Sequence, residues 1–133
     1  MIERQKGNKM FIFTAPSGAG KTTIVKHLLA KYSNLGFSVS ATTRAKRDHE
    51  TEGKDYYFMS VEEFKQKIAQ GAFVEWEEVY KDQYYGTLRS EIDRIWDEGR
   101  QLVFDIDVRG AQNIKNDFGN QCMSVFVRPP SVS

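Results

Sequence analysis

The sequence predicts an α/β fold, in which a parallel sheet flanked by helices carries an inserted, mostly antiparallel lobe. Short apolar runs rich in β-forming residues alternate with segments whose apolar residues recur at helical spacing. A glycine-rich turn at 15–20 separates the first such strand from the first such helix. Segments typical of strands then dominate 37–89, between two core parts at 1–36 and 90–133. We therefore expect one domain over residues 1–133.

The core segments alternate between strands and helices. The apolar run at 10–14 predicts a buried strand, and 21–32 predicts a helix with one apolar face. That face consists of Ile24, Val25, Leu28, Leu29 and Tyr32. Further on, 102–107 predicts a strand that ends in acid, 111–118 suits a helix, and 124–127 predicts a last strand. This order favours a parallel sheet with helices outside it.

The lobe is rich in strand signals. Strands are expected at 37–40, 56–59 and 73–79, and 42–54 is polar and without period, which predicts a loop. A polar turn at 81–83 leads into a further segment, Tyr84-Tyr85-Gly86-Thr87.

Two helices are expected beside these strands. Ser60 and Glu63 have the spacing of a capping box, and Gly71 is expected to close the helix that they begin. A second helix follows Tyr84-Tyr85-Gly86-Thr87 and stops at Gly99. Its apolar positions are Leu88, Ile92, Ile95 and Trp96. Both tryptophans, Trp76 and Trp96, are expected as core anchors because aromatic side chains bury large areas.

Composition narrows the possible partners. The 133 residues hold 19 Lys and Arg against 18 Asp and Glu, so a broad basic surface for nucleic acid is not expected. Cys122 is the one cysteine, which rules out an internal disulfide. Apolar runs are too short to span a membrane, and the first ten residues lack the apolar stretch of a signal peptide. We expect a cytoplasmic location with no nucleic-acid or membrane partner.

The glycine-rich turn has the pattern of a phosphate-binding loop. Residues 15–22, Ala-Pro-Ser-Gly-Ala-Gly-Lys-Thr, fit GxxxxGK[ST] except that Ala15 replaces the first glycine. Backbone amides of such a loop surround phosphate oxygens, and the following helix adds its positive dipole end. The predicted ATP-binding residues are Ala15, Pro16, Ser17, Gly18, Ala19, Gly20, Lys21, Thr22 and Thr23. The competing interpretation is an ordinary glycine-rich turn with a solvated lysine.

An acid at the end of an apolar strand supports the ATP site. In P-loop NTPase-type folds, such an acid holds Mg²⁺ directly or through water, beside the hydroxyl that follows the loop lysine. Asp105 ends the predicted strand, and Thr22 follows Lys21. We expect Thr22 and Asp105 to hold Mg²⁺ with ATP as the phosphoryl donor.

A second nucleotide site is indicated inside the lobe. Arg44 and Arg47, with tyrosine hydroxyls nearby in the sequence, suit a phosphate monoester. Glu75 could accept both the N1–H and the N2–H₂ protons of guanine, whereas adenine has no donor at N1. The residues therefore favour GMP over AMP.

The chain resembles the guanylate kinases, which transfer the γ-phosphoryl group of ATP to GMP or dGMP. The resemblance runs from about Met10 to Ser131. It rests on the phosphate loop and on Ser-Val-Ser-x-Thr-Thr-Arg, Gly-x-Asp-Tyr, Phe-x-Glu-Trp, Tyr-Tyr-Gly-Thr, Asp-Ile-Asp-Val-x-Gly-Ala and Pro-Pro-Ser. It implies a core sheet, a GMP-binding lobe near 37–89 and a Mg²⁺-dependent kinase of purine metabolism.

The resemblance also implies individual roles. The family's contacts to the GMP phosphate fall on Arg44, Arg47, Tyr56 and Tyr85. Its guanine contacts fall on Ser40, Glu75, Thr87 and Asp107, and Glu50 matches an acid near the nucleotide. The implied catalytic residues are Lys21, Arg44, Arg47 and Asp105. A homodimer is possible from family behaviour.

The main departure from the family lies after Pro-Pro-Ser. The family continues into an arginine-bearing lid and C-terminal helices, which this sequence does not contain. Arginines that meet the charge on a transferred phosphoryl group can contribute about 10³ to 10⁵ in rate. The alternatives are therefore a catalytically weak or inactive nucleotide- or protein-binding module of guanylate-kinase type, or another mononucleotide kinase.

Overall fold

The computed structural model describes residues 9–14 and 21–126. The chain forms two compact units. The first comprises Met1–Ser38 and Arg94–Ser133, and the second comprises Val39–Asp93. The sequence prediction placed the lobe at 37–89, so the second unit begins two residues later and ends four residues later.

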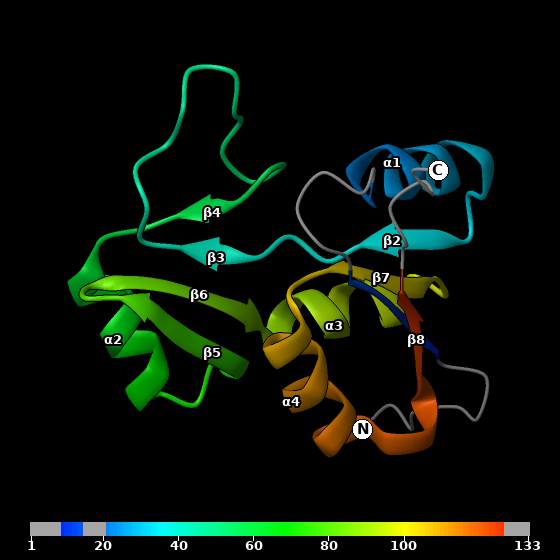
Figure 1. Ribbon diagram of the computed structural model, residues 1–133. Coiled ribbons are helices and arrows are strands. Elements are labelled where there is room, and N and C mark those ends of the chain that lie inside the picture. Colours follow the sequence, from blue (N-terminus) through cyan, green and yellow to red (C-terminus); the bar gives the residue numbers. More distant parts are fainter. Residues whose placement is uncertain (1–8, 15–20, 127–133) are drawn as a thin grey trace, which may run out of the picture. The chain divides into compact units, whose positions relative to one another are not determined.

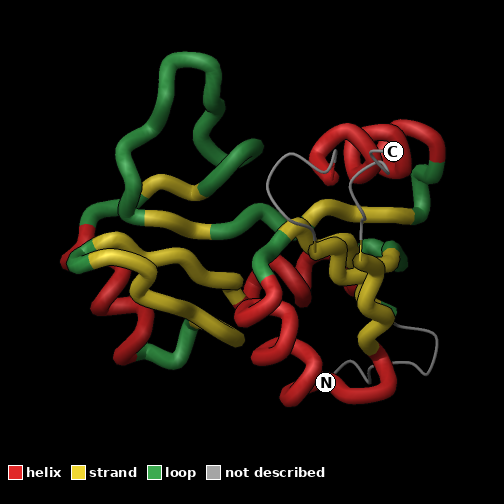
Figure 2. Tube along the Cα trace, in the orientation of Figure 1, coloured by secondary structure: helices red, strands yellow, loops and turns green. Residues whose placement is uncertain are grey.

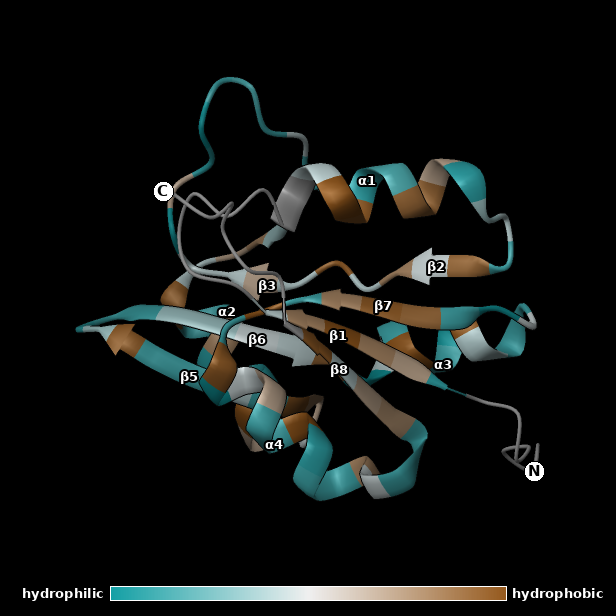
Figure 3. Ribbon diagram, turned by 45° about the vertical axis from the view of Figure 1, so that its right-hand side comes forward, coloured by the Kyte–Doolittle hydropathy of each residue, from teal (hydrophilic) through white to brown (hydrophobic). Residues whose placement is uncertain are grey.

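The first unit contains a four-stranded, fully parallel sheet in the order β2-β7-β1-β8 (Figure 1). Its strands are β1 (Met10–Thr14), β2 (Leu35–Phe37), β7 (Gln101–Asp105) and β8 (Cys122–Phe126). The central strands β1 and β7 are apolar along most of their length (Figure 3), as expected for strands covered on both faces. The predicted parallel α/β sheet is confirmed.

Helices cover both faces of this sheet. Helix α1 (Lys21–Lys31) lies on one face, where Val25 packs against Phe13 and Val103. Helix α4 (Val108–Phe118) lies on the other face, as Figures 1 and 3 agree. Its Ile114 is fully buried. A short 3-10 turn, η1 (Gly119–Gln121), joins α4 to β8.

The predicted apolar face of the first helix is wrong at its first and last residues, Ile24 and Tyr32. Val25, Leu28 and Leu29 pack into the core, whereas Ile24 and Tyr32 are exposed. At 100° per residue the five predicted positions span about 140°, and Ile24 lies at the margin of that arc. Tyr32 lies beyond Lys31, the last helical residue.

The second unit contains a mostly antiparallel sheet in the order β4-β3-β6-β5. Its strands are β3 (Ala41–Thr42), β4 (Tyr57–Phe58), β5 (Phe73–Tyr80) and β6 (Gln83–Leu88). Strand β6 pairs antiparallel with β3 and with β5, while β3 and β4 are parallel. Helix α2 (Val61–Ala69) packs its Phe64 ring on Phe73 and Tyr84, at centroid distances of 4.3 and 5.1 Å.

The helix ends follow local sequence signals. The Ser60 side chain accepts a hydrogen bond from the backbone N–H of Glu63 at 3.1 Å, as the capping-box spacing predicts. After α2, Gly71 adopts φ 72° and its N–H donates to the carbonyl of Ile68, which closes the helix. Helix α3 (Arg89–Asp97) ends in the same way, with Gly99 at φ 77°. The unit boundary divides α3 between Asp93 and Arg94.

Three sequence expectations are corrected. The predicted strand at 37–40 does not form, because β2 ends at Phe37, β3 begins at Ala41, and the intervening residues pass from one unit to the other. The predicted strand at 102–107 ends at Asp105. Trp96 is buried, but Trp76 is 42% exposed on β5, the edge strand of its sheet. Among the described residues, no helix has the length and apolar character needed to cross a membrane.

Candidate nucleotide-binding site

The predicted phosphate loop lies between β1 and α1. Ala15, Pro16, Ser17, Gly18, Ala19 and Gly20 lie outside the described residues. The described elements on either side have the arrangement that the motif requires, since β1 ends at Thr14 and α1 begins at Lys21. The first turn of α1 holds no acidic residue, so its positive dipole end is not neutralised by its own side chains.

Asp105 lies at the carboxyl end of the parallel sheet, where β1 leads into the predicted phosphate loop. It is the last residue of β7, it is half-buried, and it stands opposite Phe13 of β1 in the parallel register. The carboxylate therefore lies one residue before the point where β1 ends and the predicted phosphate loop begins.

This end of the sheet fits the way in which proteins hold Mg²⁺ with a nucleotide. Mg²⁺ in such sites keeps several waters and uses one or two protein oxygens besides the phosphates. Within the described ranges, no group of three or more His, Cys, Asp or Glu residues could hold a metal on its own. Asp105 supplies one carboxylate at this end of the sheet, and Thr22, near the start of α1, is the other predicted Mg²⁺ ligand.

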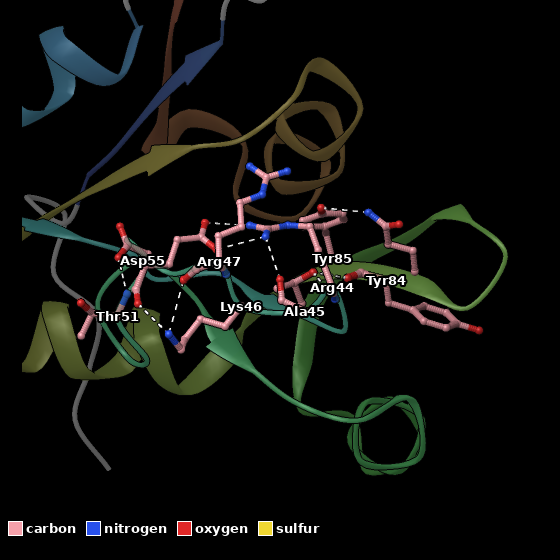
Figure 4. A network of polar contacts seen from close by, with 11 residues as sticks. Arg44, Ala45, Lys46, Arg47, Thr51, Asp55, Tyr84 and Tyr85 are labelled. Carbon is pink, nitrogen blue, oxygen red and sulfur yellow. Dashed lines mark hydrogen bonds and ion pairs between the residues drawn. The ribbon is translucent and has the colours of Figure 1, made fainter.

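An ion pair organises the loop between β3 and β4 in the second unit. Figure 2 shows this long connection, and Figure 4 shows its polar contacts. Arg44 donates from Nη1 and Nη2 to the two carboxylate oxygens of Glu50, at 3.0 and 2.8 Å. Their side chains are 15% and 8% exposed. Such a paired, two-point geometry fixes the plane of the guanidinium group.

Glu50 also binds the backbone of the loop. Its Oε1 accepts from the backbone N–H of Arg47 at 2.8 Å, and Lys46 Nζ donates to its carbonyl oxygen at 3.2 Å. The hydrogen bonds from Arg44 and then from Arg47 lower the pKa of Glu50 to about 2. The hydrogen bond to Glu50 raises the pKa of Arg44 further above its usual value. Both groups are therefore charged at neutral pH.

Two tyrosines complete this cluster. The guanidinium carbon of Arg44 lies 5.2 Å from the centroid of the Tyr56 ring and 5.9 Å from that of Phe58. The rings of Tyr56 and Tyr85 meet edge to face at 6.1 Å. The Tyr85 hydroxyl accepts from Gln83 Nε2 at 3.2 Å. Arg44, Glu50, Tyr56 and Tyr85 thus lie together, while Arg47 joins the cluster through its backbone and has an exposed side chain.

Glu75 and Thr87 face one another across β5 and β6. They are partners in the antiparallel register, and Thr87 Oγ1 donates to Glu75 Oε2 at 3.1 Å. Both residues are buried. A buried carboxylate held by a hydroxyl is a fixed acceptor of the kind that reads a donor-rich base edge.

The remaining predicted guanine contacts lie elsewhere. Ser40 is half-buried in the second unit, just before β3, and its carbonyl accepts from the N–H of Tyr57 at 2.9 Å. Asp107 belongs to the first unit, where it is exposed and caps α4 by accepting from the N–H of Gly110 at 2.7 Å. The sequence prediction had placed Asp107 in a strand.

Sequence reasoning did not single out two residues that the structure brings to this part of the second unit. Phe58 lies against the Arg44 guanidinium, and its position beside Tyr56 in an aromatic run was the available signal. Glu91 is a buried acid in the first turn of α3, on the same helix face as Ile95 four residues later. A charged residue within an apolar stripe could have revealed it.

Comparisons with known proteins assign the chain to a family. The family model described as guanylate kinase matches residues 7–133. The chain belongs to the guanylate kinase family. A guanylate kinase from Porphyromonas gingivalis is 50% identical over 125 residues, which cover 93% of this chain and 66% of that protein. One from Salinibacter ruber is 54% identical over 121 residues, covering 91% and 64%.

A solved guanylate kinase has the same fold. The crystal structure of guanylate kinase from Anaplasma phagocytophilum matches with a TM-score of 0.78 at 33% identity, covering 96% of this chain and 63% of that one. The chain spans just under two thirds of the length of these guanylate kinases.

Proposed function

We propose that this chain carries the nucleotide sites of an ATP:GMP phosphotransferase, which converts GMP or dGMP to the diphosphate. The observation that carries the proposal is the Arg44 cluster. It presents a fixed guanidinium beside two tyrosines, Tyr56 and Tyr85, in a chain of the guanylate kinase family. Fixed positive charge with hydroxyl donors suits the phosphate of a nucleoside monophosphate.

Arg44 has further N–H donors for that phosphate, although two of its nitrogens already donate to Glu50. Nη1 donates to Glu50 and to the carbonyl of Ala45, and Nη2 donates one proton to Glu50. Arg44 also hydrogen-bonds the Tyr85 side chain, and of its five N–H donors, Nε–H and the second Nη2–H lie outside the bonds to Glu50 and Ala45. They form a two-pronged edge that matches two phosphate oxygens. Arg47, with its exposed side chain, supplies further positive charge.

The base is recognised through Glu75 in this proposal. Its buried carboxylate, held by Thr87, accepts the N1–H and N2–H₂ protons of guanine. Adenine lacks the N1 donor and would leave the carboxylate without a matching partner, which is costly in a buried site. Ser40 and Asp107 are the further proposed guanine contacts. In this assignment the second unit, Val39–Asp93, is the GMP-binding lobe.

The transfer itself requires positioning rather than covalent chemistry by the protein. An oxygen of the GMP phosphate forms a bond to the γ-phosphorus of ATP, and the bond from that phosphorus to the bridging oxygen breaks, which releases ADP. Lys21 and the loop amides hold the ATP phosphates, while Arg44 and Arg47 hold the acceptor. Thr22 and Asp105 would hold Mg²⁺, which would supply positive charge that offsets the charge of the phosphates.

The proposal is tested by incubating the purified 133-residue chain with ATP, Mg²⁺ and GMP, with AMP as the control acceptor. GMP-dependent formation of ADP and GDP supports the kinase. A folded chain that binds GMP without turnover supports the alternative, a nucleotide-binding module of guanylate-kinase type. A folded chain that binds neither nucleotide contradicts both. The cytoplasmic location, the lack of nucleic-acid or membrane partners and a homodimer remain predictions.

A further inference from the structure

Glu91 is a buried acid that holds two separate segments of the second unit. It is 3% exposed, in the first turn of α3. Its Oε1 accepts from the backbone N–H of Val39 at 2.9 Å, and its Oε2 accepts from the hydroxyl of Tyr57 at 2.9 Å. An apolar side chain would fill this face of the helix without the cost of burying a carboxylate. Compared with an apolar side chain at this position, Glu91 adds these two hydrogen bonds.

Both bonded residues are direct neighbours of proposed GMP contacts. Val39 precedes Ser40, and Tyr57 follows Tyr56. The backbone N–H of Tyr57 also donates to the carbonyl of Ser40 at 2.9 Å, which closes a ring of hydrogen bonds through Glu91. Because successive side chains of an extended chain point to opposite faces, fixing Tyr57 on one face sets the direction of Tyr56 on the other.

Val39 is also the first residue of its unit. The N–H of Ser38 donates to the carbonyl of Val103 on β7, within the first unit, at 3.0 Å. The next N–H along the chain, that of Val39, donates to Glu91 within the second unit. Glu91 therefore fixes the point at which the chain enters the second unit, one residue before Ser40.

We propose that Glu91 is a positioning residue for GMP, an inference that rests on the proposed function. It does not touch the nucleotide in this assignment. It holds the Val39–Ser40 backbone and the Tyr56–Tyr57 segment in the arrangement that places Ser40 against guanine and Tyr56 against the phosphate. A carboxyl group suits this role because each of its two oxygens accepts from one of two converging donors.

Three variants separate positioning from simple packing. Glu91→Ala removes both acceptors. Glu91→Gln keeps the shape and one acceptor for Val39. Tyr57→Phe removes only the hydroxyl bond. Glu62→Gln is the matched control, since it removes the same charge from an exposed position in the first turn of α2, in the same unit. The full chain and each variant are titrated with GMP and with ATP, and circular dichroism checks that each is folded.

We expect Glu91→Ala to raise the Kd for GMP by about tenfold and Glu91→Gln and Tyr57→Phe by less, because each lost hydrogen bond to a charged group weakens the arrangement. The Kd for ATP stays unchanged in all of them, and Glu62→Gln leaves both values unchanged. A general packing defect would weaken the binding of both nucleotides and would be absent from Glu91→Gln, which keeps the shape of the side chain. Equal Kd values for GMP in the parent chain and in folded Glu91→Ala overturn the inference.

Amide hydrogen exchange distinguishes this failure from failure of the proposed function. If the parent chain binds no GMP, the proposed function falls, and with it the role of Glu91 in binding. The structural part of the inference, that Glu91 holds the Val39 backbone, is then tested by the exchange rate of the Val39 amide. Faster exchange of the Val39 amide in Glu91→Ala than in Glu62→Gln supports the hydrogen bond from Val39 to Glu91 as a constraint on this segment, and equal exchange overturns it.

Discussion

Arg44 and Glu50 show how a single ion pair can prepare a phosphate site. The Glu50 carboxylate accepts from Nη1 and Nη2 of the Arg44 guanidinium. The edge formed by Nε–H and the second Nη2–H faces away from this pair of bonds. At the same time Glu50 binds the backbone of Arg47, so one acid fixes both arginine-bearing segments. The loop between β3 and β4 thus receives its shape from charge rather than from an apolar core.

The ion pair makes stability depend on pH in a defined window. Glu50 has a pKa of about 2 in the folded chain, against an ordinary value of 4.5. A lowered pKa stabilises the folded state above 4.5, and this contribution is lost as pH falls toward 2. We expect Glu50→Gln to be less stable than the parent chain at pH 7, and the gap to narrow as pH falls through this window. Urea unfolding at a series of pH values measures it, and a gap independent of pH contradicts the assignment.

Glu75 offers a test of base selection. Glu75→Gln replaces one carboxylate oxygen by an amide donor, which opposes the N–H groups of guanine. We expect the Kd for GMP to rise by about tenfold to a hundredfold while the Kd for ATP stays unchanged. Glu78→Gln, at an exposed position on the same strand, is the control. Titration of both variants with both nucleotides decides it, and an equal loss for GMP and ATP removes Glu75 from the base site.

At the scale of elements, the sequence predicts features that depend on neighbouring residues, such as helix ends. It does not predict features that depend on partners far away in the chain. Ser60, Gly71 and Gly99 mark helix ends through hydrogen bonds within a few residues, and each of them is evident from the sequence. The strand expected at 37–40 failed because Ser38 and Val39 bond to Val103 and Glu91, more than fifty residues away. Periodicity cannot reveal such partners.

The same distinction applies to the candidate site. Arg44 was identified because its residue type suits phosphate chemistry, and Tyr56 and Tyr85 were assigned to the phosphate through the resemblance to guanylate kinases. Their arrangement around Glu50 depends on the folding of a loop that has no period. The proposed role of Glu91 depends on its hydrogen bonds to Val39 and Tyr57, partners that lie far away in the sequence and that no local pattern indicates.

Strand β6 contains a glycine that packing requires. A Cβ atom on Gly86 would lie 2.8 Å from Cδ1 of Phe73 and 3.1 Å from the backbone oxygen of Glu75. We expect Gly86→Ala to lower the free energy of unfolding by about 1–3 kcal/mol, because the Phe73 ring must leave its stack on Phe64. Gly71→Ala is the comparison, since a Cβ there meets no atom and only the positive φ of 72° opposes it. We expect a smaller loss of about 1 kcal/mol there. Urea unfolding measures both, and a Gly86→Ala chain as stable as its parent contradicts this packing.

At the scale of the whole molecule, the proposed functions divide between the two units. The predicted ATP and Mg²⁺ residues, from Ala15 to Thr23 with Asp105, belong to the first unit. The proposed GMP contacts, apart from Asp107, belong to the second. Each unit has its own sheet and its own buried cluster. Substitutions in one unit should therefore leave the fold of the other intact.

This division predicts that the two binding events can be removed one at a time. Lys21→Ala should abolish most ATP binding and leave the Kd for GMP within about twofold, because the residues proposed to bind each nucleotide belong to separate units with no shared side chain. Arg44→Ala should do the reverse, since it removes the phosphate-facing guanidinium and frees Glu50 as a repulsive charge beside the site. In the double variant the two losses should add. Calorimetric titration of the parent chain and the three variants with each nucleotide measures all eight affinities. If Lys21→Ala weakens GMP as much as ATP, the two nucleotides do not occupy separate units, and the assignment of the GMP phosphate to Arg44 has to be given up.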